Sequence, residues 1–436
     1  MKQYLGALVL SVLWVTLSMI FAFPWISDIS AVLGPILAWA IVLGMALIPG
    51  AAIAFTYGTV MFDRRHKRRD EDKPILTLED VTILIAAYNE EDVIYGTLSS
   101  LLKQTYRGRM DVIICNDGST DGTREKIQEF ITDSGWSAIR VVNSPINVGK
   151  ANVLNLGLKK AQSKNIITID ADTILEPTAV ASILTTLEHT TDDVVAVAGT
   201  VLVKNGSASW ISRLQEWDYL IGISAIKQAQ SAYENTLVAQ GAFSAYYRDN
   251  LIEILGWPDM VGEDIVLSWK FLEKGYRISH DQNAIAYTRV PETYGQFFKQ
   301  RKRWSTGLIE AFKESPKMLY PNKKGAIFVY YNALFPFLDF CFMFVFVPSI
   351  ILALFFHYYL LVGLITLLIL PLGLSVASLM FFRQKGILKR SGLKMPMSNW
   401  WGGILFFAGF QFLQVPATLA GYTTGIFNLR KSWGTK

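Results

Sequence analysis

Two long stretches without a charged residue lie at the start of the chain and constrain its fold more than any other feature. They cover residues 5–25 and 31–62, and each is long enough for a helix that crosses a bilayer, which needs about 20 apolar residues. A signal peptide is the alternative for the first stretch, but its apolar core is longer than a signal's and no clear small-x-small cleavage site follows. We therefore predict an uncleaved pair of transmembrane helices over residues 1–62, in contact with the lipid bilayer.

A basic run follows this pair and indicates its orientation. Five of the seven residues from Asp63 to Arg69 are lysine or arginine. Positive charge beside a span marks its cytosolic end, although anchoring to lipid headgroups alone would also explain the run. We expect residues 63–76 to be a cytosolic linker in a multi-pass protein of the cell (inner or plasma) membrane, with the domain that follows the linker in the cytosol.

The C-terminal part is apolar again. Residues 326–356 and 358–382 are almost uncharged, and the loop after them is basic, with Arg383, Lys385, Lys389, Arg390 and Lys394. A cytosolic loop makes these segments an out-and-back pair. Residues 400–428 form a last apolar stretch, and a single crossing would leave the basic C-terminus outside, against the same rule. We expect about three spans in residues 316–436 and five in all, and the side of the C-terminus stays open.

Composition excludes several other classes of protein. Of the 436 residues, 51% are apolar and only 18% are charged, which rules out a disordered or low-complexity chain. The net charge is only +5 and the basic residues lie in a few runs beside apolar segments, so we expect no nucleic acid partner. Cys115 and Cys341 lie in different surroundings and indicate neither a disulfide framework nor a metal cluster.

Residues 77–315 alternate between short apolar runs and helical patterns. We expect strands at 81–87, 111–115, 140–143 and 166–169, and helices at 90–103, 122–130 and 150–161. Strands that alternate with helices predict a mainly parallel sheet with right-handed crossovers. Such sheets bind ligands at the carboxyl ends of their strands. The sequence thus predicts an α/β domain inserted between transmembrane α-helices, with its site at that edge of the sheet.

Polar clusters follow three of these strands. They are Asn89-Glu90, the run from Asn116 to Gly122 that includes Asp117, and Asp170-Ala171-Asp172. The second cluster is as typical of a turn with a helix N-cap as it is of a functional site. In the third, two carboxylates at i and i+2 repel each other, and a hard cation such as Mg²⁺ or Mn²⁺ would relieve the repulsion. A cap for the helix near Glu176 is the alternative.

Two further clusters lie later in the domain. Gly262-Glu263-Asp264 precedes an apolar-periodic helix and provides either a cap or a catalytic carboxylate. Gln300-x-x-Arg303-Trp304 lies on an aromatic-rich amphipathic segment that could also be a membrane-surface helix with snorkelling basic side chains. Residues 207–229 are predicted to form an interfacial helix. The histidines His189 and His280 are expected to be surface or hydrogen-bonded residues.

The order and spacing of these clusters resemble the membrane-embedded processive glycosyltransferases of family two, which include the cellulose, chitin, hyaluronan and poly-N-acetylglucosamine synthases. The resemblance covers residues 77–315 strongly and the flanking spans by layout. Residues 238–243, 263–270 and 291–293 are most similar to the bacterial poly-β-1,6-N-acetylglucosamine synthases. One departure is Gly262, where many relatives have threonine, and it leaves both carboxylates intact.

This resemblance implies a GT-A-like fold and an inverting transfer from a UDP-sugar. It implies a donor site formed by Asn89, Glu90, Asp117, Lys150, Asp170, Gln300 and Arg303. Asp172 would bind the Mg²⁺ or Mn²⁺ ion, and Asp264, next to Glu263, would be the general base. Trp304 would stack on the growing polysaccharide acceptor, and Gly241 would allow a close backbone approach there, although a plain turn glycine is equally consistent.

The resemblance also implies the product and leaves alternatives open. The favoured product is poly-β-1,6-N-acetylglucosamine, moved across the membrane as it grows, with a small membrane accessory subunit as a further partner. Trp14, Trp400, Trp401, Gln411, Gln414 and Tyr422 could contact a sliding glycan or simply pack helices. Hyaluronan, chitin-oligosaccharide or β-glucan synthesis stays open. A non-processive polyprenyl-phosphate glycosyltransferase is another alternative, although the Gln300-x-x-Arg303-Trp304 motif opposes it. A non-catalytic transport or scaffold protein is a third, and intact Asp172 and Asp264 oppose it.

Overall fold

The computed structural model describes residues 2–62, 78–231, 233, 236–320, 326–362, 364–390 and 400–429. The predicted cytosolic linker, 63–76, lies outside these residues. So do Lys394 and the three basic residues at the C-terminus, and the side chain of Trp400 is also not described. The loop expected after residue 382 begins later, because Arg383, Lys385, Lys389 and Arg390 belong to the helix Leu364–Arg390.

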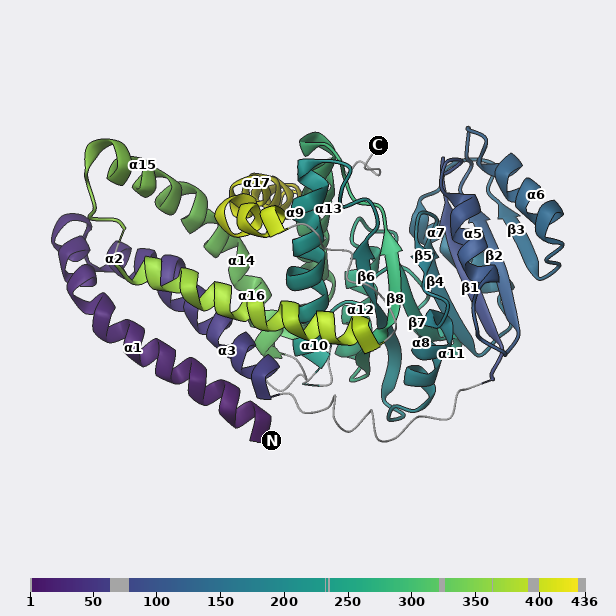
Figure 1. Cartoon of the computed structure of the whole chain (residues 1–436), viewed down its shortest axis with the longest axis horizontal. Coiled ribbons are helices and arrows are strands. Elements are labelled where there is room, and N and C mark those ends of the chain that lie inside the picture. The colour runs from purple at the N-terminus through teal and green to yellow at the C-terminus, as the bar shows by residue number, and fades with distance from the viewer. Residues whose placement is uncertain are drawn as a thin grey trace.

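One sheet forms the centre of the soluble half (Figure 1). Its strands are β1 (Val81–Ala87), β2 (Met110–Asn116), β3 (Ile139–Asn143), β4 (Asn165–Asp170), β5 (Ile174–Leu175), β6 (Val194–Val203), β7 (Phe243–Tyr247) and β8 (Arg277–Thr288). They lie in the order β3-β2-β1-β4-β7-β6-β8-β5. Pairings are parallel from β3 to β4 and between β6 and β8. β7 runs antiparallel between β4 and β6, and β5 runs antiparallel to β8.

Helices cover both faces of this sheet, so its central strands are buried on both sides. The helices are α5 (Ile94–Leu102), α6 (Thr123–Ser134), α7 (Lys150–Lys160), α8 (Ala179–Glu188), α11 (Arg248–Glu253) and α12 (Glu263–Glu273). Apolar side chains of α5, α6 and α8 pack into one core, and those of α7 and α12 pack into a second. Burial on both faces explains why β1, β4 and β6 read as unbroken apolar runs rather than as alternating patterns.

The predicted strands and helices before Asp170 are confirmed, with ends that differ by a few residues. Thus the helix expected at 90–103 begins at Ile94, after a turn, and the helix expected at 122–130 continues to Ser134. Strands β5 to β8 are additions to the prediction. β7, with the sequence FSAYY, is the strand that makes the sheet mixed, because it inserts antiparallel between two strands that the chain reaches much earlier.

Amphipathic helices connect the sheet to the apolar half. They are α9 (Trp210–Trp217), the π-helix η2 (Asp218–Ala225), α10 (Ile226–Ser231), α13 (Tyr294–Glu314) and the short 3₁₀-helix η3 (Pro316–Leu319). The expected helix at 207–229 therefore exists, interrupted by a π-helical segment. Such segments are frequent at functional sites.

The apolar half consists of α1 (Lys2–Leu33), α2 (Pro35–Val42), η1 (Leu43–Leu47), α3 (Ile48–Phe62), α14 (Ala326–Cys341), η4 (Phe342–Phe346), α15 (Val347–Phe356), α16 (Leu364–Arg390) and α17 (Trp400–Ile426). Gly34, at φ +82°, reverses the chain between the first two helices. Among the described residues, Leu5–Leu33, Pro35–Phe62 and Ala326–Phe356 are long and apolar enough to cross a membrane. The bent pair Trp401–Phe407 and Gly409–Ile426 would make a fourth crossing. The count of five stays a prediction.

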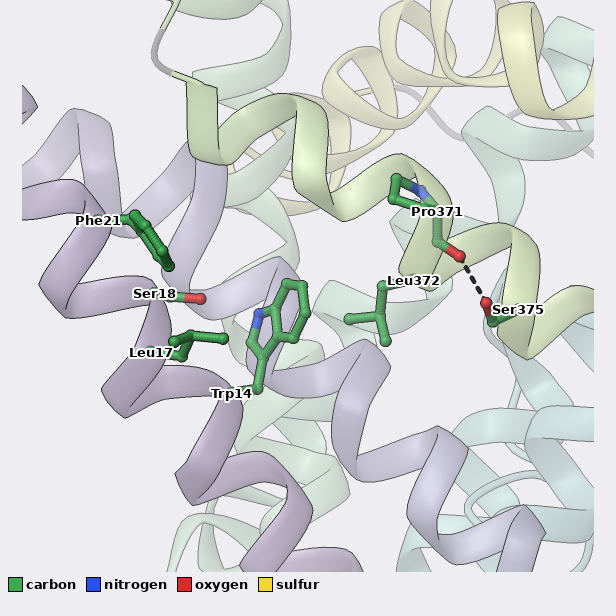
Figure 2. Close-up of a pocket in the computed structure, with 7 residues that line it drawn as sticks. All are labelled: Trp14, Leu17, Ser18, Phe21, Pro371, Leu372 and Ser375. Carbon is green, nitrogen blue, oxygen red and sulfur yellow. Dashed lines mark hydrogen bonds between the residues drawn. The ribbon is translucent and has the colours of Figure 1, made fainter.

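A hollow of about 440 Å³ lies between α1 and α16 (Figure 2). It is lined mainly by apolar side chains, together with two serines and an indole: Trp14, Leu17, Ser18, Phe21, Pro371, Leu372 and Ser375. Because it contains no carboxylate or basic side chain, it does not have the chemistry expected at the strand ends, and the functional site lies elsewhere.

Candidate active site

The loops that follow β1 and β2 are tied to each other by side chains. Asn89, at φ +56°, accepts a hydrogen bond on Oδ1 from the Thr120 amide at 2.8 Å. The Glu90 amide donates to Thr123 Oγ1 at 2.7 Å. Asn116 Oδ1 accepts from the Ser119 amide, and Asp121 Oδ1 accepts from the Thr123 amide. These contacts are typical of a turn that leads into α6, whose N-cap residue Gly122 has no side-chain cap. A nucleotide contact by Asn89, Glu90 or Asp117 stays a prediction.

Asp117 fixes the loop that leads into α7. Its two carboxylate oxygens accept hydrogen bonds from the amides of Val148 and Gly149, at 2.7 and 3.0 Å, and the residue is buried. The carboxylate thus holds the backbone immediately before Lys150. Its predicted contact with uracil or ribose would use lone pairs that these two amides leave free.

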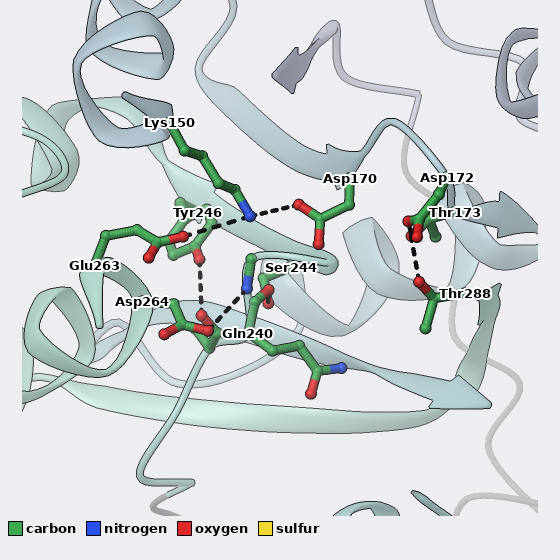
Figure 3. Close-up of polar contacts among 12 residues, drawn as sticks. Lys150, Asp170, Asp172, Thr173, Gln240, Ser244, Tyr246, Glu263, Asp264 and Thr288 are labelled. Atoms are coloured by element: carbon green, nitrogen blue, oxygen red, sulfur yellow. Dashed lines mark hydrogen bonds and ion pairs between the residues drawn. The ribbon is translucent and has the colours of Figure 1, made fainter. Parts of the chain in front are cut away.

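Lys150 joins two of the predicted carboxylates. It is the first residue of α7, and its Nζ lies against Asp170 Oδ1 and 3.4 Å from Glu263 Oε1 (Figure 3). Although burial opposes it, the negative charges of Asp170 and Glu263 raise the pKa of Lys150, which keeps the ammonium charged. Burial raises the pKa of Glu263 to about 7, and the nearby positive charge of Lys150 opposes this shift. The structure therefore brings the last residue of β4 and the first residues of α7 and α12 together.

Asp264 lies beside this group, at the second position of α12. Its Oδ2 accepts a hydrogen bond from the Gly241 amide at 3.2 Å, and its Oδ1 accepts one from the Ile265 amide at 2.8 Å. A Cβ atom on Gly241 would lie 2.7 Å from Lys150 Nζ and 3.6 Å from Glu263 Oε1. Gly241 is thus a site of close approach, which the sequence left equal with a plain turn, and its neighbours are the carboxylates and Lys150.

Asp172 lies just beyond β4, apart from the Lys150 group. Its Oδ1 accepts hydrogen bonds from Thr288 Oγ1 of β8 at 3.0 Å and from Thr173 Oγ1 at 3.3 Å. Burial, followed by the negative charge of Asp170, raises the pKa of Asp172 to about 6. No group of three or more His, Cys, Asp or Glu side chains suited to a metal occurs in the described part of the chain. A cation at Asp172 would therefore take most of its ligands from groups other than the His, Cys, Asp and Glu side chains of the described residues.

α13 carries the last predicted residues. It begins with a capping box in which Thr293 accepts from the Gln296 amide. Gln300 is buried. Burial has the largest effect on the pKa of Glu263 and raises it, and the positive charges of Lys150 and Arg303 oppose this shift, so Arg303 lies within electrostatic range of Glu263. In the described part of the chain, Gln300 Oε1 and Arg303 Nε have no hydrogen-bond partner.

Trp304, in the middle of α13, is 37% exposed. The guanidinium of Arg301 stacks on its indole, 4.2 Å from the ring centroid, and the ring of Tyr219 lies 6.3 Å away. Arg301 also pairs with the buried Asp218 at 2.7 Å. Trp304, the predicted acceptor residue, therefore packs against an arginine that the Arg301–Asp218 ion pair holds in place.

Sequence reasoning missed several residues that the fold brings to the site. They are Asp218, Tyr219, Lys227, Gln240, Thr288 and Arg301. A weak signal existed for Asp218 and Lys227, because they are two of the four charged residues in the segment 207–229, with Arg213 and Glu216. Thr288 and Gln240 carry no such signal, since only the pairing of distant strands places them near the carboxylates.

Comparison with known proteins identifies the family of this chain. The profile of Glycosyl transferase family 2 matches residues 82–255. A poly-β-1,6-N-acetyl-D-glucosamine synthase of Staphylococcus aureus (strain MSSA476) is 35% identical over 231 residues, 53% of this chain and 55% of that protein. The chain thus aligns with about half the length of this relative. A synthase of the same name from Staphylococcus epidermidis is 30% identical over 295 residues, 67% of this chain and 69% of that protein.

A solved structure shares the fold. The mannosyltransferase PcManGT from Pyrobaculum calidifontis, in complex with GDP-Man and Mn²⁺, matches with a TM-score of 0.53 at 18% identity, over 88% of this chain and 99% of that chain. The predicted GT-A-like fold, flanked by apolar helices, is thereby confirmed. With the Staphylococcus epidermidis synthase aligned over more than two thirds of its length, the chain belongs to glycosyl transferase family 2.

Proposed function

We propose that this chain is a UDP-sugar-dependent hexosyltransferase that polymerises UDP-N-acetylglucosamine into poly-β-1,6-N-acetylglucosamine. The observation that carries the proposal is the convergence of Lys150, Asp170 and Glu263, with Asp264 beside them, at the carboxyl ends of the strands. The names of the Staphylococcus synthases support the sugar and the linkage.

In the proposed reaction, Asp264 removes the proton from the acceptor hydroxyl as its oxygen attacks the anomeric carbon of the donor. The bond from that carbon to the diphosphate breaks, UDP leaves, and the anomeric configuration inverts. Lys150, at the start of α7, and Arg303, which faces Glu263, would supply positive charge toward the diphosphate. Trp304 would hold the terminal sugar of the acceptor by stacking.

Asp172 would hold a divalent cation, Mg²⁺ or Mn²⁺, and Asp170 would help to seat the donor. The fit rests on the burial of Asp172 and on the repulsion from Asp170, both of which a cation would offset. When bound, this ion would neutralise charge on the departing UDP. The Mn²⁺ in the mannosyltransferase complex supports this class of metal.

We further propose that the product crosses the membrane as it grows, with the soluble half in the cytosol and a small membrane subunit as a partner. The three long apolar helices support a multi-pass membrane protein. The basic run after residue 62 supports a cytosolic soluble half.

The test uses the full chain in membrane vesicles and compares UDP release from a panel of UDP-sugars in the presence of Mn²⁺ or Mg²⁺. We expect release to be fastest with UDP-N-acetylglucosamine and the product to be a β-1,6-linked ladder by sizing and linkage analysis. A single glycolipid product would instead identify a non-processive enzyme, and a different preferred donor would refute the assigned sugar.

The same assay tests the base. We expect Asp264→Asn to lower turnover by about 10²- to 10⁴-fold, the usual range for a general base, with UDP affinity retained. Near-normal turnover of Asp264→Asn would show that another group takes the proton.

A further inference from the structure

Lys227 is a buried charge that the proposed reaction does not use. It lies on α10, is only 8% exposed, and is part of none of the ion pairs found in the described residues. Burial lowers the pKa of Lys227 to about 7, and the negative charge of Asp264 opposes this shift. Burying an ammonium is costly unless strong hydrogen bonds compensate it, and Nζ of Lys227 makes two such bonds.

Those contacts are with one short segment, residues 237–241. Lys227 Nζ donates to the Val238 carbonyl at 2.9 Å and to Gln240 Oε1. Gln240 Nε2 in turn donates to the Gly199 carbonyl of β6 at 2.9 Å. Lys227 therefore ties this segment to α10, and Gln240 ties it to the sheet.

The segment needs such ties because it has no regular secondary structure and is largely buried. Its backbone polar groups are satisfied by side chains instead of by a strand partner. The Leu237 amide donates to Gln230 Oε1, and the Ala239 carbonyl accepts from Tyr246 OH. Lys227 is the one charged donor among these described contacts, and it holds the Val238 carbonyl.

The far end of the segment holds the proposed base. The Gly241 amide donates to Asp264 Oδ2 at 3.2 Å. One turn later in α12, Ser268 Oγ accepts from the Ala239 amide at 2.9 Å and donates to the Asp264 carbonyl at 2.6 Å. A displacement of residues 238–241 would thus move both the carboxylate of Asp264 and the first turn of its helix.

We propose that Lys227 is a positioning residue for Asp264: it fixes segment 237–241, whose Gly241 amide orients the carboxylate. This role rests on the proposed function, because it concerns the acceptor-deprotonating step. The helix that carries Lys227 packs against α3 of the apolar half, so the base is supported from the membrane side.

The test compares Lys227→Met with Gln228→Leu, a control on the same helix. Gln228 is similarly buried, and its Nε2 donates to Gln282 Oε1 of β8 at 3.1 Å. We expect Lys227→Met to keep UDP affinity within about twofold and to lower kcat by about ten- to a hundredfold, as a misplacement of about 1 Å can do. Gln228→Leu should keep most of the kcat.

Two further measurements separate positioning from loss of folding. Gln240→Met removes the hydrogen bond between Lys227 Nζ and Gln240 Oε1 by changing the acceptor instead of the donor. The double variant should therefore lose little more kcat than the worse single variant. Hydrogen exchange of the peptide that covers residues 237–243 should be faster in Lys227→Met than in wild type or Gln228→Leu. If Lys227→Met does not insert into membranes, Gln240→Met should show the same split between kcat and UDP affinity.

Unchanged kcat, unchanged exchange, multiplicative losses in the double variant, or an equal loss in Gln228→Leu would each overturn the role of Lys227. The exchange experiment needs no substrate. A wild-type chain that is inactive with every UDP-sugar would therefore refute the proposed function while exchange still decides whether Lys227 holds the segment.

Discussion

Asp172 differs from the neighbouring carboxylates in what balances its charge. Lys150 lies against Asp170 and Glu263, whereas Asp172 Oδ1 receives hydrogen bonds from two threonine hydroxyls. Its pKa is raised to about 6, so in the absence of a cation its ionisation destabilises the fold as the pH rises from about 4 through 6. A bound cation would reverse this effect, because it requires the ionised carboxylate.

We therefore expect the rise in Tm caused by Mn²⁺, with UDP present, to be larger at pH 7.5 than at pH 5.0. Asp172→Asn should remove most of this difference. Thr288→Val, which removes an outer partner of the carboxylate, should weaken Mn²⁺ binding by about tenfold or more. Thermal unfolding in detergent across a Mn²⁺ titration measures all three proteins, and an unchanged Mn²⁺ response in Asp172→Asn would place the cation elsewhere.

At the scale of elements, the position of α12 depends on a contact between two glycines. A Cβ atom on Gly262 would lie 2.4 Å from the Cα atom of Gly307 in α13, and the Gly262 amide donates to the buried Glu310 Oε2 at 3.0 Å. Backbone meets backbone here, so no side chain can turn away to make room. This contact explains the departure at Gly262 from the threonine of many relatives: in this chain the two helices are too close for it.

We expect Gly262→Thr, which introduces the residue common in the family, to impair this protein. Overpacking of this kind costs about 1–3 kcal/mol, and the shift of α12 should also lower UDP release because Glu263 and Asp264 follow directly. Gly295→Ala is the control, since open space surrounds that position on α13. Unfolding midpoints and kcat measure the effect, and a fully active, equally stable Gly262→Thr would contradict the close packing.

Two of the amphipathic elements that connect the sheet to the apolar half meet at a buried ion pair. Asp218 of η2 pairs with Arg301 of α13, and the guanidinium lies over the rings of Trp304, Phe297 and Phe410 at 4.2, 4.9 and 5.7 Å. Lysine carries the same charge but has no planar group to stack on three rings. The orientation of Trp304 thus depends on arginine at position 301.

Arg301→Lys should consequently slow elongation by about tenfold, because a misplaced acceptor reacts slowly, while UDP affinity changes little. Lys302→Ala, which removes a charge from the same turn, is the comparison and should elongate normally. Polymer length and UDP binding are measured on the same membranes. Equal elongation by wild type and Arg301→Lys would separate the ion pair from the acceptor site.

At the scale of the whole molecule, α17 links α14 of the apolar half to α13, the helix that carries several of the predicted site residues. On one side, Asp339 of α14 accepts hydrogen bonds from Thr418 Oγ1 at 2.6 Å and Tyr422 OH at 3.0 Å. On the other side, Thr306 Oγ1 of α13 donates to the Gly421 carbonyl at 3.1 Å. The helix that carries Arg303 and Trp304 is thus connected to α14 through α17.

The double variant Thr418→Val with Tyr422→Phe should leave Asp339 without its two donors and cost about 1–3 kcal/mol. Adding Asp339→Leu should restore part of that loss, since an apolar side chain has no hydrogen bonds to lose. The half-time of thermal inactivation in detergent ranks the variants. A triple variant less stable than the double would mean that Asp339 is held by other groups.

How far the sequence predicted this molecule depends on the range of the interactions. The strands up to Asp170 and the carboxylates at their ends were predicted, because apolar runs and the residues after them are local patterns. The sequence did not predict the antiparallel insertion of β7, the contact of Thr288 with Asp172, or the role of Lys227 near Asp264. Each of these depends on chain segments that lie dozens of residues apart. Gly241 is intermediate: its glycine was noticed, but its neighbours Lys150 and Glu263 follow only from the folded arrangement.

The buried cores have a consequence for how such enzymes can be recombined. Val329 of α14 and Tyr422 of α17 belong to the same core as Trp269 of α12, and residues of α16 share a core with Leu202 and Ile285 of the sheet. The soluble and apolar halves are therefore not interchangeable modules. A chimera that exchanges residues 77–315 between two members of the family would have to carry the matching faces of α14, α16 and α17 with it, so these surfaces should diverge together among relatives rather than independently.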